Sequence, residues 1–222
     1  AKLGKISRRC STSCMTKRPV RFLSFEGPDG GGKSTQIRLL VERLRTAGWN
    51  VVQTAEPGGT AIGQQIRNVL LDGRNQELSP VTELLLYFAS RAQNVDQCIR
   101  PALEQGAVVI ADRYTDSTLV YQGWARGLGE DVVRELHAIA CRGVEPQLTI
   151  CLDVDLEVGA ARLGARAAAD RLEQQSREFH ERVRDGYLRL AIAEPERVKV
   201  VDASRSVDEV AGDIWRIVEA AL

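Results

Sequence analysis

The chain has 222 residues, of which 44% are hydrophobic and 27% are charged, a composition typical of a folded globular domain rather than of a disordered chain. Its 30 basic and 30 acidic side chains balance, so no net charge favours a nucleic acid or an anionic membrane as partner. No apolar run in the sequence approaches the ~18 residues that a membrane-spanning helix requires.

The N-terminal residues 1–14 differ in composition from the rest of the chain. They include basic and Ser residues but no acidic residue, a pattern found in organelle transit peptides. An upstream extension or a cloning remnant explains the same pattern, and we favour it because Met15, the single methionine, lies just before the first predicted strand. We expect 1–14 to be a disordered leader or such a remnant, and 15–222 to form one domain.

Beyond this leader, short apolar runs alternate with longer helical patterns, which is typical of a parallel sheet with crossover helices. The predicted strands are 20–26, 50–54, 107–112, 147–153 and 197–202. The predicted helices are 33–47, 60–71, 80–100, 130–142, 155–167, 171–193 and 206–221. We expect Pro101 to end the third helix. Because ligands of open parallel sheets bind beyond the carboxyl ends of the strands, functional residues are expected directly after strands, at 26–35, 54–60, 112–122 and 153–173.

A phosphate-binding motif follows the first predicted strand. Gly27, Gly32, Lys33 and Ser34 satisfy G-x-x-x-x-G-K-[ST] between that strand and the next helix. Backbone N–H groups of such a loop cradle phosphates, the Lys33 ammonium would reach the terminal phosphates, and the Ser34 hydroxyl would bind Mg²⁺. The motif predicts a nucleoside triphosphate site. Its expected contacts are Gly27, Pro28, Asp29, Gly30, Gly31, Gly32, Lys33, Ser34 and Thr35.

Charged residues also follow the second and third predicted strands. The segment 56–60 reads Glu-Pro-Gly-Gly-Thr, which is either a tight turn that caps the next helix or a place for Glu56 at the mouth of a cleft, with Arg67 further along. Asp112 ends an apolar strand, where a carboxylate commonly holds Mg²⁺ or its waters. Arg113 next to it is suited to bidentate binding of a second phosphate, although the same pair could be a surface ion pair.

Two pairs of residues with helical spacing add candidate binding groups. Tyr87 and Arg91 are four residues apart and share a helix face, so a ring that stacks on a base could lie beside a donor to the base edge. The alternative places Tyr87 in the core and directs Arg91 to solvent. Arg162 and Arg166 have the same spacing. They belong either to a solvated helix face or to a flap that brings arginines onto phosphates.

Taken together, these segments resemble the thymidylate kinase family over nearly the whole chain from Val20. The most specific segment is D-R-Y-x-x-S-T-x-V-Y-Q at 112–122, and 56–60, 87–93 and 170–173 match the family in order and spacing. The resemblance implies a P-loop nucleoside monophosphate kinase fold, an α/β architecture with a five-stranded parallel sheet flanked by helices and a short helical lid at about 160–173. It also implies phosphorylation of dTMP to dTDP with ATP and Mg²⁺ in dTTP biosynthesis.

The resemblance assigns roles to individual side chains. Tyr87 stacks on thymine, Arg91 donates a hydrogen bond to the base, and Tyr121 packs against the deoxyribose. Asp29 holds the sugar 3′-hydroxyl, and Arg113 binds the monophosphate. The full set of expected dTMP contacts is Asp29, Glu56, Arg67, Tyr87, Arg91, Arg113, Ser117, Thr118, Tyr121 and Gln122.

The same family places its catalytic arginine either in the phosphate loop or in the lid. Positions 28–31 of the loop contain no arginine, so the resemblance implies the bacterial type, with Arg166 or Arg162 of the lid supplying the charge. The expected catalytic residues are Lys33, Arg166, Arg162, Arg113 and Asp29. The expected Mg²⁺ ligands are Ser34 and Asp112.

The expected partners are dTMP, ATP and, by the resemblance, a second copy of the chain in a homodimer, with neither nucleic acid nor membrane. The five cysteines form no C-x-x-C pair, which predicts reduced thiols in a cytoplasmic protein. Two other functions remain open: a P-loop kinase for a different nucleoside monophosphate, and a regulatory P-loop ATPase. A GTPase is disfavoured because the chain lacks an N-K-x-D motif.

Overall fold

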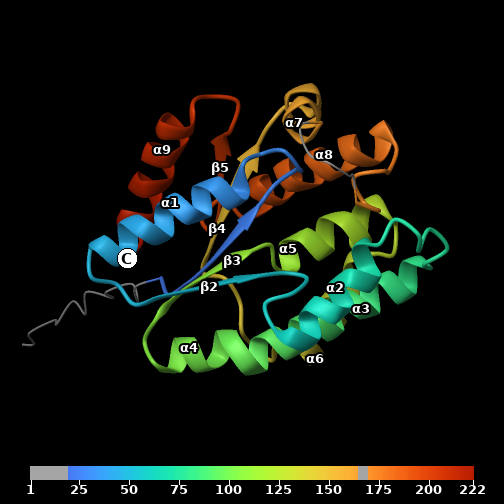
Figure 1. Cartoon of the computed structure of the whole chain (residues 1–222), viewed down its shortest axis with the longest axis horizontal. Helices are drawn as coiled ribbons and strands as arrows, with labels where there is room; N and C mark the ends of the chain where they lie inside the picture. Colours follow the sequence, from blue (N-terminus) through green and yellow to red (C-terminus); the bar gives the residue numbers. More distant parts are fainter. Residues whose placement is uncertain (1–19, 165–169) are drawn as a thin grey trace, which may run out of the picture.

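A computed structural model describes residues 20–164 and 170–222. Within them, one five-stranded parallel sheet has the order β2-β3-β1-β4-β5 (Figure 1). The strands are β1 (Phe22–Glu26), β2 (Val51–Ala55), β3 (Val108–Asp112), β4 (Leu148–Asp153) and β5 (Val198–Asp202). Each predicted strand is confirmed to within a residue or two, and so is the fold class. Because all strands run in the same direction, their carboxyl ends share one edge of the sheet.

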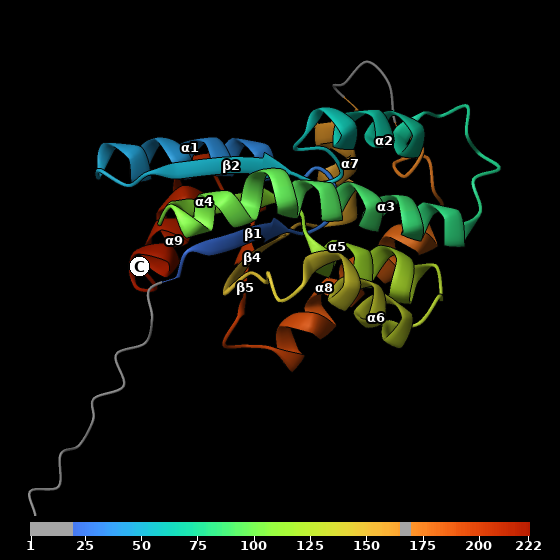
Figure 2. The ribbon, with the colours of Figure 1, turned by 90° about the horizontal axis from the view of Figure 1, so that it is seen from below.

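Helices cover both faces of the sheet. They are α1 (Lys33–Thr46), α2 (Ala61–Leu71), α3 (Pro80–Asn94), α4 (Arg100–Glu104), α5 (Thr115–Thr118), α6 (Glu130–Cys141), α7 (Leu156–Leu163), α8 (Arg177–Ala193) and α9 (Val207–Glu219). On one face, α1 and α9 bury a cluster that includes Ile37, Leu44 and Ile214. The other face is covered by α3, α4, α6 and α8 (Figures 1 and 2). Burial on both faces explains why β1, β3 and β4 read as nearly continuous apolar runs.

The prediction that Pro101 ends the third helix is wrong. After α3 the chain continues through a π-helical segment, Val95–Ile99, directly into α4, and Pro101 lies in the first turn of α4. Pro101 has no N–H to donate to the preceding turn, and a π-helical segment changes the hydrogen-bonding pattern where that donor is missing. The helical course therefore passes the proline instead of stopping at it.

Two further helical segments differ from the prediction. The segment after β3, for which neither helix nor strand was predicted, forms α5 and a second π-helical segment, Leu119–Ala125. In addition, α8 begins at Arg177 rather than at 171, because the Ser176 side chain accepts from the backbone N–H of Phe179 and caps the helix there. Residues 171–174 form turns instead.

Several expectations fall outside the described residues. These are the leader, 1–14, and residues 165–169 of the expected lid, which include Arg166. Within residues 20–164 and 170–222, no helix has both the length and the apolar character to cross a membrane.

Candidate active site

The phosphate loop closes over the carboxyl end of β1. Gly27 has a φ of +122°, and a Cβ atom there would lie 2.2 Å from the carbonyl oxygen of Leu152. Gly30 has a φ of +79°, and its Cβ would lie 2.3 Å from the carbonyl oxygen of Gly159. Only glycine fits this backbone path, which brings the loop against β4 and α7.

Lys33 folds back over the loop that precedes it. Its Nζ donates to the carbonyl oxygens of Gly27 at 3.0 Å and Pro28 at 2.8 Å, and lies 3.8 Å from the Asp29 carboxylate. Burial, together with the positive charge of Arg113, lowers the pKa of Lys33 to about 8. Lys33 is the first residue of α1. A phosphate bound at this helix N-terminus would favour the charged form of the ammonium.

Ser34, in the first turn of α1, lies against Asp112 at the end of β3. The Ser34 hydroxyl donates to Asp112 Oδ2 at 3.1 Å, and both residues line the pocket. A hydroxyl and a carboxylate are oxygen donors of the kind that Mg²⁺ prefers. Among the described residues there is no cluster of three or more His, Cys, Asp or Glu suited to a metal. The pair therefore fits a Mg²⁺ ion that takes its other ligands from phosphates and water.

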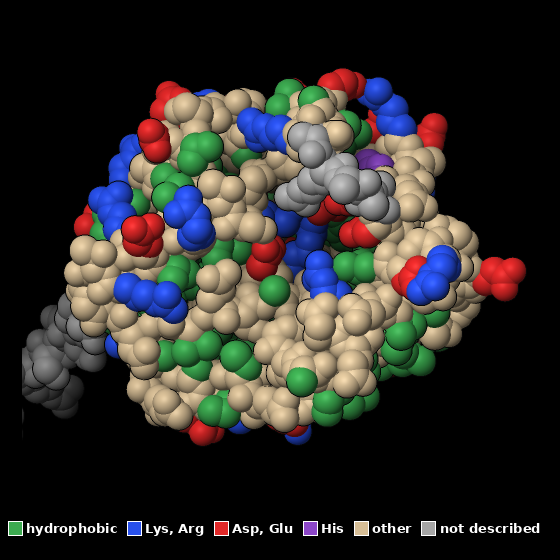
Figure 3. Space-filling view, in the orientation of Figure 1, with side chains coloured by type: hydrophobic (Ala, Val, Ile, Leu, Met, Phe, Trp, Pro, Cys, Tyr) green, Lys and Arg blue, Asp and Glu red, His purple; other side chains and the backbone are tan. Residues whose placement is uncertain are grey.

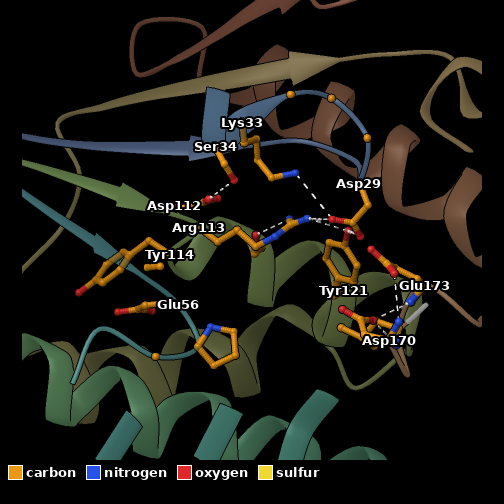
Figure 4. A pocket seen from close by; sticks show the side chains of 18 of the residues that line it. Asp29, Lys33, Ser34, Glu56, Asp112, Arg113, Tyr114, Tyr121, Asp170 and Glu173 are labelled. Carbon is orange, nitrogen blue, oxygen red and sulfur yellow. Dashed lines mark hydrogen bonds and ion pairs between the residues drawn. The ribbon is translucent and has the colours of Figure 1, made fainter. Parts of the chain in front are cut away.

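Arg113 directly follows β3, and its guanidinium lies between the phosphate loop and α5. Its backbone has a φ of +70°, a conformation that is strained for a non-glycine residue. Its Nη2 donates to Asp29 Oδ1 at 2.5 Å (Figure 4). Its Nη1 donates to the Gly27 carbonyl oxygen at 3.2 Å. Burial alone would raise the pKa of Asp29, but Arg113 and Lys33 outweigh it and hold that pKa well below its usual range. Asp29 is therefore a carboxylate.

Arg91 is buried at the end of the pocket away from the phosphate loop. Its Nε donates to Glu56 Oε2 at 2.5 Å and its Nη2 to Thr118 Oγ1 at 2.9 Å. Its Nη1 has no hydrogen-bond partner among the described residues, although buried donors are nearly always paired. Arg91 and Tyr87 both line the pocket, so the interpretation that directs Arg91 to solvent does not hold.

Glu56 lines the pocket but is buried within a polar cluster rather than free at its mouth. Besides Arg91, its carboxylate accepts from Asn94 Nδ2 at 2.9 Å. Arg67 also lines the pocket, with its Nη1 bound to the Pro57 carbonyl oxygen at 2.8 Å. The structure thus places Glu56 behind Arg91, where it orients the guanidinium.

Gln122 lines the pocket and contacts a buried acidic residue behind it, Glu83, which sequence reasoning missed. Gln122 Nε2 donates to Glu83 Oε1 at 2.8 Å, and Arg171 Nη2 donates to Glu83 Oε2 at 2.5 Å. Arg171 Nε is bound to the Leu70 carbonyl oxygen at 2.8 Å. Because Arg171 is buried in these contacts, it is poorly placed to reach a phosphate. The sequence predicts Glu83 only as an acidic residue in the first turn of a helix, and nothing in it indicates a contact with Gln122 or Arg171.

Arg162 lies at the far side of the phosphate loop from Arg91. Its Nη1 donates to the Ala203 carbonyl oxygen at 2.9 Å and to the Gly30 carbonyl oxygen at 3.4 Å. Ala203, Arg205 and Val207, which follow β5, line the same side of the pocket. Sequence reasoning missed this segment, even though the rule that ligands lie beyond strand ends applies to β5 as well.

These groups surround one cleft of about 570 Å³, within the range of small-molecule sites. Figure 3 shows it as a hollow in which basic and acidic side chains lie next to each other. Of the predicted site residues, Gly27 and Pro28 contribute through their carbonyl contacts to Lys33, and Arg166 lies outside the described residues. The others line the cleft: Asp29, Gly30, Gly31, Gly32, Lys33, Ser34, Thr35, Glu56, Arg67, Tyr87, Arg91, Asp112, Arg113, Ser117, Thr118, Tyr121, Gln122 and Arg162.

Comparison with known proteins gives one consistent match. A family model described as thymidylate kinase matches residues 25–214. The thymidylate kinase of Symbiobacterium thermophilum is 56% identical over 201 residues, covering 90% of this chain and 94% of that protein. That of Deinococcus radiodurans is 49% identical over 197 residues, with 89% and 95% covered. The crystal structure of thymidylate kinase from Ehrlichia chaffeensis is similar with a TM-score of 0.74 and 33% identity, covering 91% of this chain and 99% of that one.

Proposed function

The chain belongs to the thymidylate kinase family, and from that premise we propose that its cleft transfers the γ-phosphoryl group of ATP in line to the phosphate of dTMP. The protein phosphorylates dTMP to dTDP with ATP as the donor, a step toward dTTP. The observation that carries the mechanism is the convergence of two cations. Lys33 Nζ and Arg113 Nη1 both donate to the Gly27 carbonyl oxygen, at 3.0 and 3.2 Å, and both approach Asp29.

The acceptor dTMP binds between Arg113 and Arg91. Nη1 of Arg91, which has no hydrogen-bond partner within residues 20–164 and 170–222, supports a hydrogen bond to the thymine edge. The Tyr87 ring on the same helix face supports stacking on the base. Arg113 grips the monophosphate. Asp29, a carboxylate within hydrogen-bonding reach of that cation, accepts from the 3′-hydroxyl of the sugar, and Tyr121 borders the sugar.

The donor ATP occupies the other arm of the cleft. Its phosphates lie on the phosphate loop with Lys33, and its base lies against the surface formed by Arg162 and the segment 203–207 that follows β5. Mg²⁺ would be held by Ser34 and Asp112 and would neutralise charge on the transferring phosphoryl group. The acceptor is already an ionised phosphate, so no strong general base is required, and positioning and charge supply the catalysis.

The lid at about 160–173 completes the site. The phosphate loop contains no arginine at 28–31, and Arg171 is bound to Glu83 and Leu70. These observations favour Arg166 or Arg162 as the arginine that stabilises the transition state. We therefore propose that residues 15–222 form one kinase domain and that this lid is part of it.

The substrate proposal is tested by measuring ADP release with a panel of nucleoside monophosphates. We expect dTMP to be the best acceptor and dUMP, which lacks one methyl group, to have a roughly 10- to 200-fold lower kcat/KM. Omission of Mg²⁺ should abolish the reaction. A faster reaction with a purine monophosphate would show that the chain serves a different acceptor. ATP hydrolysis that no monophosphate stimulates would instead identify a regulatory ATPase.

We also propose a homodimer formed through α2, α3 and α6. These neighbouring helices (Figure 2) expose apolar side chains, among them Ile62, Leu85 and Ile139, and burial of such a surface stabilises association. We expect Ile139→Glu to shift the protein from dimer to monomer in light scattering. The matched control is Ile192→Glu on α8, because Ile192 is 82% exposed and Ile139 72%. A monomeric wild type, or equal effects of both variants, would contradict this interface.

A cytoplasmic location completes the proposal. Cys98, Cys141 and Cys151 are free thiols, which is usual where the surroundings are reducing. Both substrates of the reaction are nucleotides made inside cells.

A further inference from the structure

A buried carboxylate lies directly behind the phosphate loop. Glu26 is the last residue of β1 and precedes Gly27, and its exposed fraction is 0%. It is not among the described residues that line the cleft, so it does not meet a substrate itself. Burying a carboxylate costs free energy unless hydrogen bonds compensate. An apolar residue would suit the end of a strand that is buried on both faces, so the partners of Glu26 must explain its presence.

The partners of Glu26 all come from segments that border the acceptor site. Its Oε1 accepts from the backbone N–H of Tyr114 at 2.7 Å. Its Oε2 accepts from the Ser117 hydroxyl and, at 3.2 Å, from the Tyr187 hydroxyl. Tyr114 directly follows Arg113, Ser117 lies on α5, and Tyr187 lies on α8. Glu26 therefore connects β1 to the strained turn at Arg113 and to two hydroxyl groups.

The same two hydroxyls are contacts of Arg113. Its Nη1 donates to Ser117 Oγ at 3.1 Å and to Tyr187 OH at 3.1 Å. A guanidinium only donates, and each hydroxyl has a single proton. The hydroxyl protons must therefore point to Glu26 or to each other, across the 2.8 Å that separates Ser117 Oγ from Tyr187 OH. Because Glu26 accepts the protons of the Ser117 and Tyr187 hydroxyls, the lone pairs of both oxygens remain free to accept from Arg113.

We propose that Glu26 is a positioning residue that acts through Ser117 and Tyr187 to hold the Arg113 guanidinium in the orientation that receives the phosphate of dTMP. This inference rests on the proposed binding of that phosphate by Arg113. Asp29 contacts the guanidinium from the loop side through Nη2, whereas the hydroxyl pair holds Nη1 from behind. We expect these rear contacts to remain in place when a phosphate competes with Asp29 at the front.

The electrostatics of Glu26 agree with this arrangement. Burial and the neighbouring Asp116 raise the pKa of Glu26 to about 7, whereas Arg113 and the hydrogen bonds from Ser117 and Tyr114 oppose the rise. The contacts that Glu26 orients therefore favour its charged form, whereas burial and Asp116 oppose that form and prevail in the raised pKa. Removal of that charge should loosen the orientation of Arg113 without touching Arg91 or Tyr87, which contact the base.

The test compares binding of dTMP with binding of thymidine, which has the same base and sugar but no phosphate. For Glu26→Gln we expect dTMP affinity to fall about tenfold or more in calorimetric titration, as when a charged hydrogen-bonding group is lost. Thymidine affinity should stay within about twofold, because its contacts do not involve Arg113 Nη1. Equal losses for both ligands would show a merely structural role, and no loss for either would also overturn the inference.

Two further variants keep the inference falsifiable. Tyr187→Phe removes one of the two hydroxyls and leaves Glu26 in place, so it should lower dTMP affinity less than Glu26→Gln does and again spare thymidine. This variant decides the case if Glu26→Gln fails to fold. Unchanged dTMP affinity in Tyr187→Phe would then overturn the proposed role of Glu26.

Arg113→Met separates this inference from the proposed function. It should remove most of the advantage of dTMP over thymidine. If Arg113→Met retains that advantage, the assignment of the phosphate to Arg113 is wrong. If Arg113→Met loses it but Glu26→Gln retains it, only the role of Glu26 is wrong.

Discussion

Replacement of Lys33 by Met should lower kcat on the order of 10³-fold, the size of effect seen when a preorganised electrostatic donor is removed from an active site. The methionine keeps the apolar length of the side chain and loses the ammonium. That ammonium is buried, lies against the carbonyl oxygens of Gly27 and Pro28, and is positioned where charge develops on the transferring phosphoryl group. The dTMP affinity should stay within a few-fold, because the acceptor contacts come from Arg113, Arg91 and Tyr87.

Steady-state kinetics with ATP and dTMP measure this effect, and binding of dTMP alone gives the affinity. Lys199→Met is the matched control: Lys199 is on β5, is bound to the Pro195 carbonyl oxygen, and does not line the cleft. Its kcat should equal that of the wild type. A Lys33→Met protein with kcat within tenfold of the wild type would remove Lys33 from the catalytic set.

Arg166→Ala should also lower kcat on the order of 10³-fold or more, with dTMP affinity nearly unchanged, because an arginine delivered to the transferring phosphoryl group acts mainly in the transition state. The phosphate loop contains no arginine at 28–31. We therefore expect the lid to supply the arginine that stabilises the transition state. Arg162 is the natural comparison, since it precedes Arg166 by four residues in the sequence.

Arg162→Ala should mainly raise the KM for ATP. The Arg162 guanidinium is bound to carbonyl oxygens of the phosphate loop and of the segment after β5, a position beside the proposed donor base rather than at the reacting phosphates. If Arg162→Ala lowers kcat and Arg166→Ala does not, the catalytic role belongs to Arg162. Arg171 is a poor third candidate. It forms an ion pair with the buried Glu83, so its replacement would lower the stability of the fold by leaving that charge unpaired.

The sequence by itself determined the strands, the phosphate loop and the family. Each of these depends on local patterns: apolar runs, a motif of fixed spacing, and the segment 112–122 read in one stretch. Parallel direction and the shared carboxyl edge then follow from the alternation of strands and helices. For this reason the sequence alone assigns Lys33, Ser34, Asp112 and Arg113 to one cleft.

Only the tertiary structure decided how side chains from distant segments pair within that cleft. Glu56 is 35 residues from Arg91 along the chain, and Glu26 is 91 residues from Ser117, so no spacing rule connects either pair. The strand order β2-β3-β1-β4-β5 places these elements side by side, and burial then requires each polar group to find a partner. Local pattern thus specifies which residues reach the edge of the sheet, whereas packing specifies which of them touch substrate and which, like Glu26, act from behind.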